Sequence, residues 1–183
     1  MKRILLLCLV VLFITGCLPW ARTGGPFTAP AQNVSVDLPD GWMRKNTKDY
    51  LLVTRDGPLL QYIIVENIHA TDALYHTKKK FRTGMLPQEQ AEVIIDNTSS
   101  NPEILKLRII SNKPTKINGY SGFKVVYTYK DKNGLQYKSM YYGFMNGEWF
   151  YGIRYNAPLR HYYKKELNSF KKVVKSLKLI HKS

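Results

Sequence analysis

Cysteines, acidic residues and long apolar segments are all scarce in this sequence. Its two cysteines are Cys8 and Cys17, so residues 18–183 contain no disulfide and no cysteine nucleophile, and an apolar core must stabilise them. The longest apolar run, residues 4–14, has eleven residues, whereas a membrane-spanning helix needs roughly 20. Acidic residues number 13 against 28 Lys and Arg, and the formal net charge of +15 favours anionic partners.

The motifs of several enzyme classes are also missing. The chain has no G-x-S-x-G nucleophile elbow, no H-E-x-x-H zinc site, no P-loop, no G-x-G-x-x-G turn and no calcium-loop pattern. The acidic residues are scattered, and His69 and His76 lie in a polar segment typical of solvated histidines rather than of a metal site. The sequence therefore predicts no catalytic residue, no metal and no cofactor, in a protein that is not an enzyme.

The first residues have the layout of a secretory signal peptide, with Lys2 and Arg3 before the apolar run and small residues after it. The exit of the run resembles the bacterial lipobox, which is formed here by Ile14, Thr15, Gly16 and Cys17. The resemblance implies that residues 1–16 are a removable signal peptide and that Cys17 carries a diacylglycerol and an acylated amine, such as a palmitoyl amide. An ordinary signal peptide with an incidental cysteine is the alternative.

A lipid on Cys17 would make the membrane the first partner and place the protein in the cell envelope. In lipoproteins an Asp after the cysteine tends to retain the protein at the inner membrane, and Leu18 stands there instead. We therefore expect the lipid to anchor the protein to the outer membrane, with the domain facing the periplasm. The charge remains +13 once Lys2 and Arg3 are removed. Anionic envelope polymers or another envelope protein are the expected partners, and export disfavours nucleic acid.

Composition divides the rest of the chain into a linker and one domain. Residues 17–32 contain three prolines, adjacent glycines and no periodicity, so we interpret them as the lipid-anchored cysteine and a flexible tether. Residues 33–183 have the common size of a single domain and no internal repeat.

Hydrophobic periodicity predicts the elements of this domain. Asn146-Gly147 between two apolar runs is a strong hairpin signal. Apolar residues from Leu159 to Leu177 recur every three or four positions, which predicts a long helix that packs on the sheet. Strands are expected at 34–38, 50–54, 59–66, 104–111, 123–129, 135–145 and 148–156, with helices at 86–97 and 159–177.

These elements predict an α+β fold, an α/β/α sandwich with a mainly antiparallel sheet and a long C-terminal helix. The segments LPDGW, INGYSGFKVVYTY and FKKVVKSLKL, in this order along residues 33–180, resemble the PsbP-like fold. That fold includes an extrinsic photosystem subunit and a Ran-binding eukaryotic protein. The resemblance implies a PsbP-like domain with a non-enzymatic adaptor or binding role. It implies no particular partner, because no partner-contacting motif of that family maps onto this chain.

Two features are candidate binding surfaces. The first is a basic segment around one aromatic ring. It is either solvated surface or a contact with anionic headgroups in which the ring enters the membrane interface, and it comprises Lys78, Lys79, Lys80, Phe81 and Arg82. The second is a set of tyrosines that either pack ordinarily on strands or line a ligand groove: Tyr127, Tyr129, Tyr137, Tyr141, Tyr142, Tyr151 and Tyr155.

Together these observations predict a lipid-anchored envelope lipoprotein that acts as a non-catalytic binding or assembly module. Two alternatives stay open, namely an envelope carrier that holds an apolar small molecule between sheet and helix, and a hydrolase with an unrecognised site. A deep closed pocket would favour the alternatives, whereas a filled core with shallow grooves would favour the module.

Overall fold

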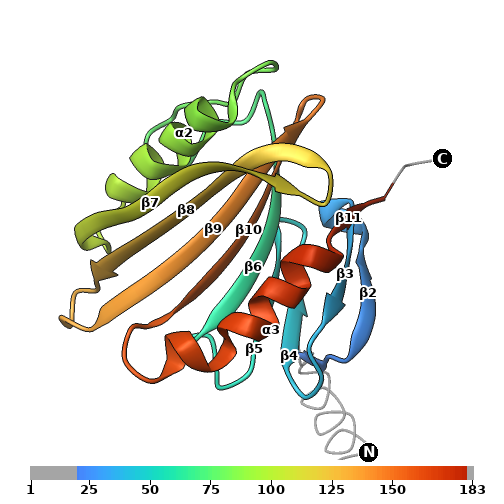
Figure 1. Ribbon diagram of the computed structural model, residues 1–183, viewed down its shortest axis with the longest axis vertical. Helices are drawn as coiled ribbons and strands as arrows, with labels where there is room; N and C mark the ends of the chain where they lie inside the picture. Colours follow the sequence, from blue (N-terminus) through green and yellow to red (C-terminus); the bar gives the residue numbers. More distant parts are fainter. Residues whose placement is uncertain (1–19, 181–183) are drawn as a thin grey trace, which may run out of the picture.

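The computed structural model describes residues 20–180, and an eight-stranded sheet is its largest element (Figure 1). All neighbouring strands of this sheet are antiparallel. From one edge to the other they are β1 (Ala21–Arg22), β4 (Met43–Asn46), β5 (Tyr50–Thr54), β6 (Tyr62–His69), β10 (Trp149–Pro158), β9 (Gln136–Asn146), β8 (Tyr120–Lys130) and β7 (Leu105–Ile117).

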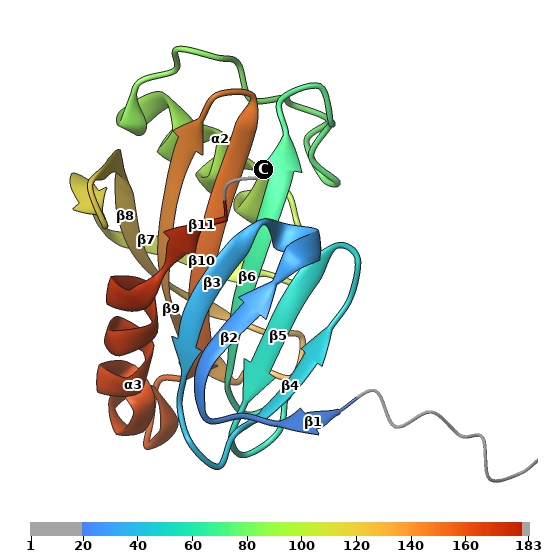
Figure 2. The same cartoon turned by 90° about the vertical axis from the view of Figure 1, so that its right-hand side faces the viewer.

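Two helices cover opposite faces of this sheet. Helix α2 (Pro87–Ser99) packs against β7, β8 and β9 on one face. Helix α3 (Tyr162–Ser176) packs on the other face against β10. A second sheet shares that face with α3 (Figure 2), and its order is β11 (Lys178–Leu179), β3 (Val34–Leu38) and β2 (Gly25–Ala29). A short 3-10 helix, η1 (Pro30–Gln32), joins β2 to β3.

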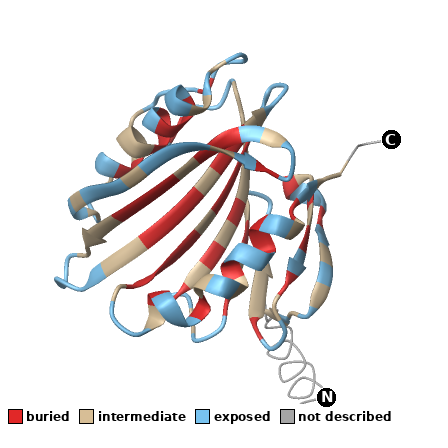
Figure 3. Cartoon of the chain, viewed as in Figure 1, coloured by how far each residue is buried: buried red, intermediate tan, exposed pale blue. Residues whose placement is uncertain are grey.

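Strand alternation divides the core into two apolar clusters, one on each face of the large sheet. On β10, Phe150 faces α2, whereas Tyr151, Ile153 and Tyr155 face α3. Figure 3 shows buried residues along β8, β9 and β10 and on the inner side of α3. Because α2 packs on one face and α3 with the small sheet on the other, the central strands carry buried apolar side chains on both faces.

Most predicted elements are present. The meander predicted for the second half is β8–β9–β10, and Asn146 ends β9 at the turn before β10. The 50–66 hairpin is β5–β6, and the two predicted helices are α2 and α3. Helix α3 begins three residues later than predicted because residues 159–161 form a turn after β10, with His161 at a positive φ of 67°. A sheet-dominated α+β fold is thus confirmed.

The predicted tether is wrong from Ala21 onward. Residues 21–32 form β1, β2 and η1, and β2 pairs with β3 from Gly25 to Ala29. The ring of Phe27 lies 4.0 Å from the Arg44 guanidinium carbon, and Gln32 is fully buried. Prolines and glycines in this segment accommodate short edge strands and a turn rather than a flexible linker. The folded domain therefore begins near residue 21 instead of 33.

Within residues 20–180, no helix has the length and apolarity needed to cross a bilayer. Residues 1–19, which include Cys8 and the predicted lipobox with Cys17, lie outside the described part of the chain.

Candidate functional site

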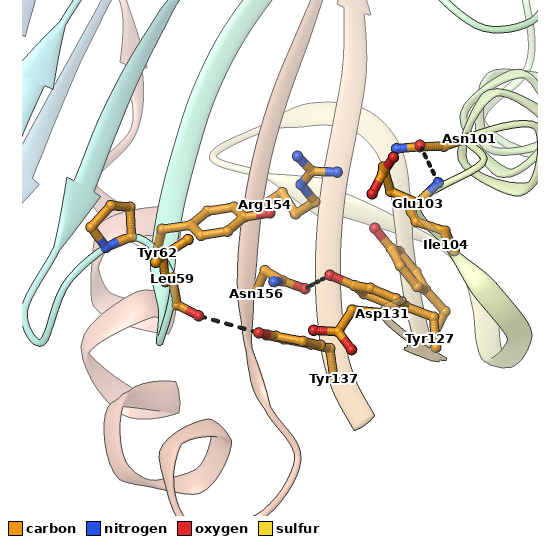
Figure 4. A pocket seen from close by; sticks show the side chains of 12 residues that line it. Leu59, Tyr62, Asn101, Glu103, Ile104, Tyr127, Asp131, Tyr137, Arg154 and Asn156 are labelled. Atoms are coloured by element: carbon orange, nitrogen blue, oxygen red, sulfur yellow. Dashed lines mark hydrogen bonds between the residues drawn. The ribbon is translucent and has the colours of Figure 1, made fainter. Parts of the chain in front are cut away.

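A groove lies on the α2 face of the large sheet, next to the part that α2 covers. It consists of two adjoining cavities of about 300 and 330 Å³. Both cavities are lined by Arg154 from β10 and by Asn101 and Ile104, which follow α2 in the chain. Figure 4 shows the first cavity, with Arg154 between Tyr62 and the segment at residues 101–104. Open cavities of this size receive small molecules or parts of larger ones.

Strand register brings the floor of the groove together. Arg154 lies opposite Ile64 on β6 and opposite Tyr141 on β9. Even-numbered residues of β6 and β10 point to the same face as odd-numbered residues of β8 and β9. The floor therefore carries polar and aromatic residues from four strands: Tyr62, Glu66, Tyr127, Tyr129, Tyr137, Tyr141, Arg154 and Asn156.

Arg154 is the central charged group of the groove. Its Nε atom is buried and has no hydrogen-bond partner among the described residues. None of the ion pairs formed within residues 20–180 includes it. Its guanidinium carbon lies 5.9 Å from the centre of the Tyr62 ring, a cation–π distance. An arginine has five N–H donors in a fixed fork, so this side chain retains unused donor capacity.

Glu66 lies near Arg154, but its carboxylate accepts a hydrogen bond from a neighbouring tyrosine. The Tyr141 hydroxyl donates a 2.8 Å hydrogen bond to Glu66 Oε1. A side chain on Gly152 would block this contact, because a Cβ atom there would lie 2.3 Å from Tyr141 Oη and 3.2 Å from Glu66 Oε1. Gly152 therefore permits the Tyr141 ring to cross β10 and reach the carboxylate.

The tyrosine floor at the other end of the groove is held in place by hydrogen bonds. The Tyr129 hydroxyl donates to Asn156 Oδ1 at 3.1 Å, and Ser139 donates to the same oxygen. The Tyr137 hydroxyl donates to the Leu59 carbonyl at 3.2 Å. The rings of Tyr129 and Tyr137 stack with their centres 5.3 Å apart. These contacts fix the aromatic surface before any ligand binds.

A tyrosine is already protonated at neutral pH, and burial opposes its ionisation further. Burial raises the pKa of Tyr62, of Tyr129 and, most strongly, of Tyr141, where Glu66 adds to the rise. Burial alone would lower the pKa of Arg154, but Tyr62, Tyr127, Glu66 and Tyr141 together raise it well above its ordinary value. Arg154 is therefore a permanent positive charge beside neutral tyrosines.

A larger hollow of about 740 Å³ lies between the small sheet and α3, and its buried carboxylate already has an ion-pair partner. The buried Glu166 forms an ion pair with Arg55 and accepts a 3.0 Å hydrogen bond from Ser169. The groove around Arg154 is therefore the better candidate, since its central charge lacks an ion-pair partner among the described residues.

The structure corrects the prediction for Phe81. Its side chain is 1% exposed and stacks on Phe150 with ring centres 4.0 Å apart, inside the cluster between α2 and the sheet. Entry of this ring into a membrane interface is therefore wrong, because the ring is already buried in the core. Its basic neighbours Lys78, Lys80 and Arg82 are exposed.

Acidic residues of α2 lie beside the basic segment. Lys79 forms an ion pair with Asp96. Glu89, Glu92 and Asp96 line the same shallow hollow as Lys79, Lys80 and Arg82. These acids offset part of the positive field, and contact with an anionic surface through Lys78, Lys79, Lys80 and Arg82 stays a prediction.

The described residues contain no group of three His, Cys, Asp or Glu side chains arranged to hold a metal ion. His69 Nδ1 instead lies 2.7 Å from the Thr71 hydroxyl, and its Nε2 lies 3.5 Å from Glu148 Oε2. Of the tyrosines noted in the sequence, Tyr127, Tyr129, Tyr137 and Tyr141 reach the groove. Tyr142, Tyr151 and Tyr155 pack on the α3 face.

Several groove residues escaped the sequence analysis. Arg154, Asn156 and Gly152 alternate with the apolar residues of β10, so they resembled a solvent-facing edge of an amphipathic strand. No local sequence signal identifies them, because their burial follows from the position of β10 between β6 and β9, in a sheet with apolar residues on both faces. An arginine at such a position has an unusual environment.

Comparisons with known proteins show similarity of fold. No family model matches the chain, and no curated protein sequence matches it. The Ran-binding protein Mog1p of Saccharomyces cerevisiae aligns with a TM-score of 0.59 and 9% identity, over 87% of this chain and 97% of its own. Cyanobacterial PsbP (CyanoP) of Synechocystis sp. PCC 6803 gives 0.57 and 11%, over 90% and 95%.

LpqN of Mycobacterium tuberculosis, described as involved in cell envelope biogenesis, gives a TM-score of 0.53 and 10% identity, over 88% of this chain and 91% of its own. A Bacteroides thetaiotaomicron protein gives 0.55 and 12%, but this chain spans only 50% of its length. At these identities the likeness shows the fold alone, and that fold is the one that CyanoP and Mog1p share.

Proposed function

We propose that this protein is a lipid-anchored lipoprotein of the cell envelope that acts as a non-catalytic binding module, with the groove around Arg154 as its binding site. The observation that carries the proposal is the groove itself, in which a charged arginine lies among fixed tyrosines and its buried Nε has no partner within residues 20–180. The lipobox-like residues before Cys17 support the anchor. Attachment to the outer membrane, facing the periplasm, belongs to the same proposal.

The similar folds support a binding role. Mog1p is described as a Ran-binding protein, and LpqN as a protein of envelope biogenesis. Within the described residues, the groove also lacks a paired nucleophile and base. Its tyrosines keep their protons at neutral pH, and both cysteines precede residue 18.

A filled interior favours this module over a carrier of an apolar molecule. Between α2 and the sheet, the stacked rings of Phe81, Phe123 and Phe150 occupy the space that such a molecule would need. Between α3 and the sheet, Phe170 and Tyr155 stack with ring centres 5.4 Å apart. The remaining cavities are open hollows rather than closed chambers.

Metabolic labelling with an alkyne fatty acid tests the anchor. The full chain is expressed in a bacterium with two membranes, and the fractions are separated on a density gradient. We expect label on the parent and on the Cys8→Ser control, recovery with the outer membrane, and no label on Cys17→Ser. Equal labelling of Cys17→Ser would disprove lipid attachment at this residue.

Photo-crosslinking in intact cells tests the groove as the binding site. Leu59 is 85% exposed at its rim, and Lys164 is exposed on α3. A photoreactive phenylalanine analogue at position 59 should give a discrete adduct that the same analogue at position 164 does not give. Identical patterns from both positions would reject the groove.

A further inference from the structure

We propose that the groove binds a small ligand whose carboxylate or phosphate group sits on Arg154 and whose ring-shaped body lies on the tyrosine floor. This inference rests on the proposed binding function and deepens it by naming the chemical class of the ligand. Arg154 occupies the boundary between the two cavities, because it lines both of them.

The first argument is the unfavourable position of Arg154 in the ligand-free protein. It stands on β10, between β6 and β9, with its Nε buried and unpaired among the described residues. A buried N–H without a partner destabilises the fold, and an apolar side chain would pack there at lower cost. Carboxylate and phosphate groups each present two oxygens that match the guanidinium fork and can accept hydrogen bonds from it.

The second argument is that the acidic residues around the groove already have partners. Glu66 accepts from Tyr141, and Glu103 forms an ion pair with Lys132. Asp131 Oδ1 accepts 2.9 and 2.8 Å hydrogen bonds from the backbone N–H groups of Asn133 and Leu135. Among the described residues that line the two cavities, Arg154 is the only lysine or arginine.

The third argument is the shape and chemistry of the surface on both sides of Arg154. The first cavity offers tyrosine rings and the side chain of Asn156, and the second offers Tyr141, Asn97 and Asn101. Each cavity, at about 300 Å³, has the size of one sugar or aromatic ring with its substituents. Tyrosine presents an apolar ring and a polar tip, which suits a ring that carries hydroxyl groups.

Titration of the lipidated full-length protein in phosphatidylcholine nanodiscs tests the ligand class. The probes are glucuronate and glucose 1-phosphate, with glucose and glucosamine as uncharged and cationic controls. Calorimetry should detect both anionic probes and neither control. Arg154→Gln should lower the affinity for both anionic probes about tenfold or more. Arg108→Gln, which removes an exposed arginine of β7, should leave both affinities unchanged.

Two further variants separate a binding role from a structural one. Arg154→Met should bind no anionic probe yet unfold at the same temperature as the parent or higher, because it removes an unpaired buried donor. Arg154→Lys keeps the charge without the fork, and its affinity should fall between those of the parent and Arg154→Gln. A structural arginine would give the opposite result, with lower unfolding temperatures and unchanged affinity in the variants that fold.

Phosphatidylinositol in the nanodisc distinguishes the source of the anion, because its headgroup joins a phosphate to a ring that carries hydroxyl groups. If added phosphatidylinositol competes with glucose 1-phosphate in the parent, the group on Arg154 is a lipid headgroup, whereas the absence of competition assigns a free ligand. Equal binding of glucose or glucosamine, or unchanged affinity in Arg154→Gln, overturns the inference. Absence of binding by either anionic probe overturns it too. If neither anionic probe binds but the photoreactive analogue at position 59 still gives its adduct, the ligand class is wrong while the groove remains the binding site. The two proposals can therefore fail separately.

Discussion

Two residues of β10, Gly152 and Arg154, determine the geometry and the charge of the groove. Gly152 has no side chain, and that absence lets Tyr141 reach Glu66 across β10. Arg154, two residues later, has a charge without an ion-pair partner among residues 20–180. A methyl group at position 152 would disturb the contact between Tyr141 and Glu66, whereas a neutral side chain at position 154 would remove the positive charge.

Gly152→Ala should lower the free energy of unfolding by about 1–3 kcal/mol. The added Cβ would lie 2.3 Å from Tyr141 Oη, so the ring must shift and the buried hydrogen bond to Glu66 is lost. Urea unfolding measures the change. Tyr141→Phe removes the clashing hydroxyl, so the double variant should be less destabilised than the sum of the two single variants. Strict additivity would show that the two groups do not interfere.

Local sequence context conceals the environments of Phe81 and Arg154 for opposite reasons. Phe81 stands among four basic residues, so it resembled surface, although it stacks on Phe150. Arg154 stands among aromatic residues of a strand, and only the pairing of β10 with both β6 and β9 reveals its confinement. Both environments depend on contacts distant in sequence, which periodicity does not encode.

At the scale of elements, strong periodicity predicted the strands and helices that carry the core. The alternation of β8, β9 and β10 and the stripe of α3 each identified an element. The strands β1, β4 and β11 have two to four residues, too few to display a period, and β2 begins with Gly25-Pro26, which interrupts any alternation. Their identity comes from pairing, such as that of β2 with β3, and the proline and glycine content of residues 18–32 concealed it.

Removal of β1 and β2 should therefore destabilise the domain. A chain that starts at Gln32 loses the pairing of β2 with β3 and the contact of Phe27 with Arg44. We expect lower cooperativity and a free energy of unfolding several kcal/mol below that of a chain that starts at Leu18. Equal stabilities of the two chains would restore the interpretation of residues 18–32 as a tether.

At the scale of the whole molecule, buried tyrosines link stability to alkaline pH. Burial raises the pKa of Tyr129, Tyr141 and Tyr155, and it raises that of Tyr163 to about 12. In the unfolded chain a tyrosine ionises with a pKa of about 10. Between these values the native state holds more protons than the unfolded state, so stability falls as the pH rises.

The free energy of unfolding should decline steeply above about pH 10, by about 1.4 kcal/mol per pH unit for each buried tyrosine. Urea titrations at successive pH values measure this slope. The Tyr163 hydroxyl is buried without a partner among the described residues. Tyr163→Phe should therefore leave the free energy of unfolding at neutral pH nearly unchanged. Above about pH 10 its decline with pH should be shallower by the contribution of one tyrosine. An unchanged slope would exclude Tyr163 from the linkage.

The position of β1 limits how a lipidated chain can stand on its membrane. Three residues separate Cys17 from Ala21, so four Cα-to-Cα steps of at most about 3.5 Å each limit the distance between them to about 14 Å. The basic segment packs beside α2, at the end of the molecule opposite β1 (Figures 1 and 2). If Cys17 carries a lipid, a connection this short would hold β1 near the bilayer and direct Lys78, Lys80 and Arg82 away from it.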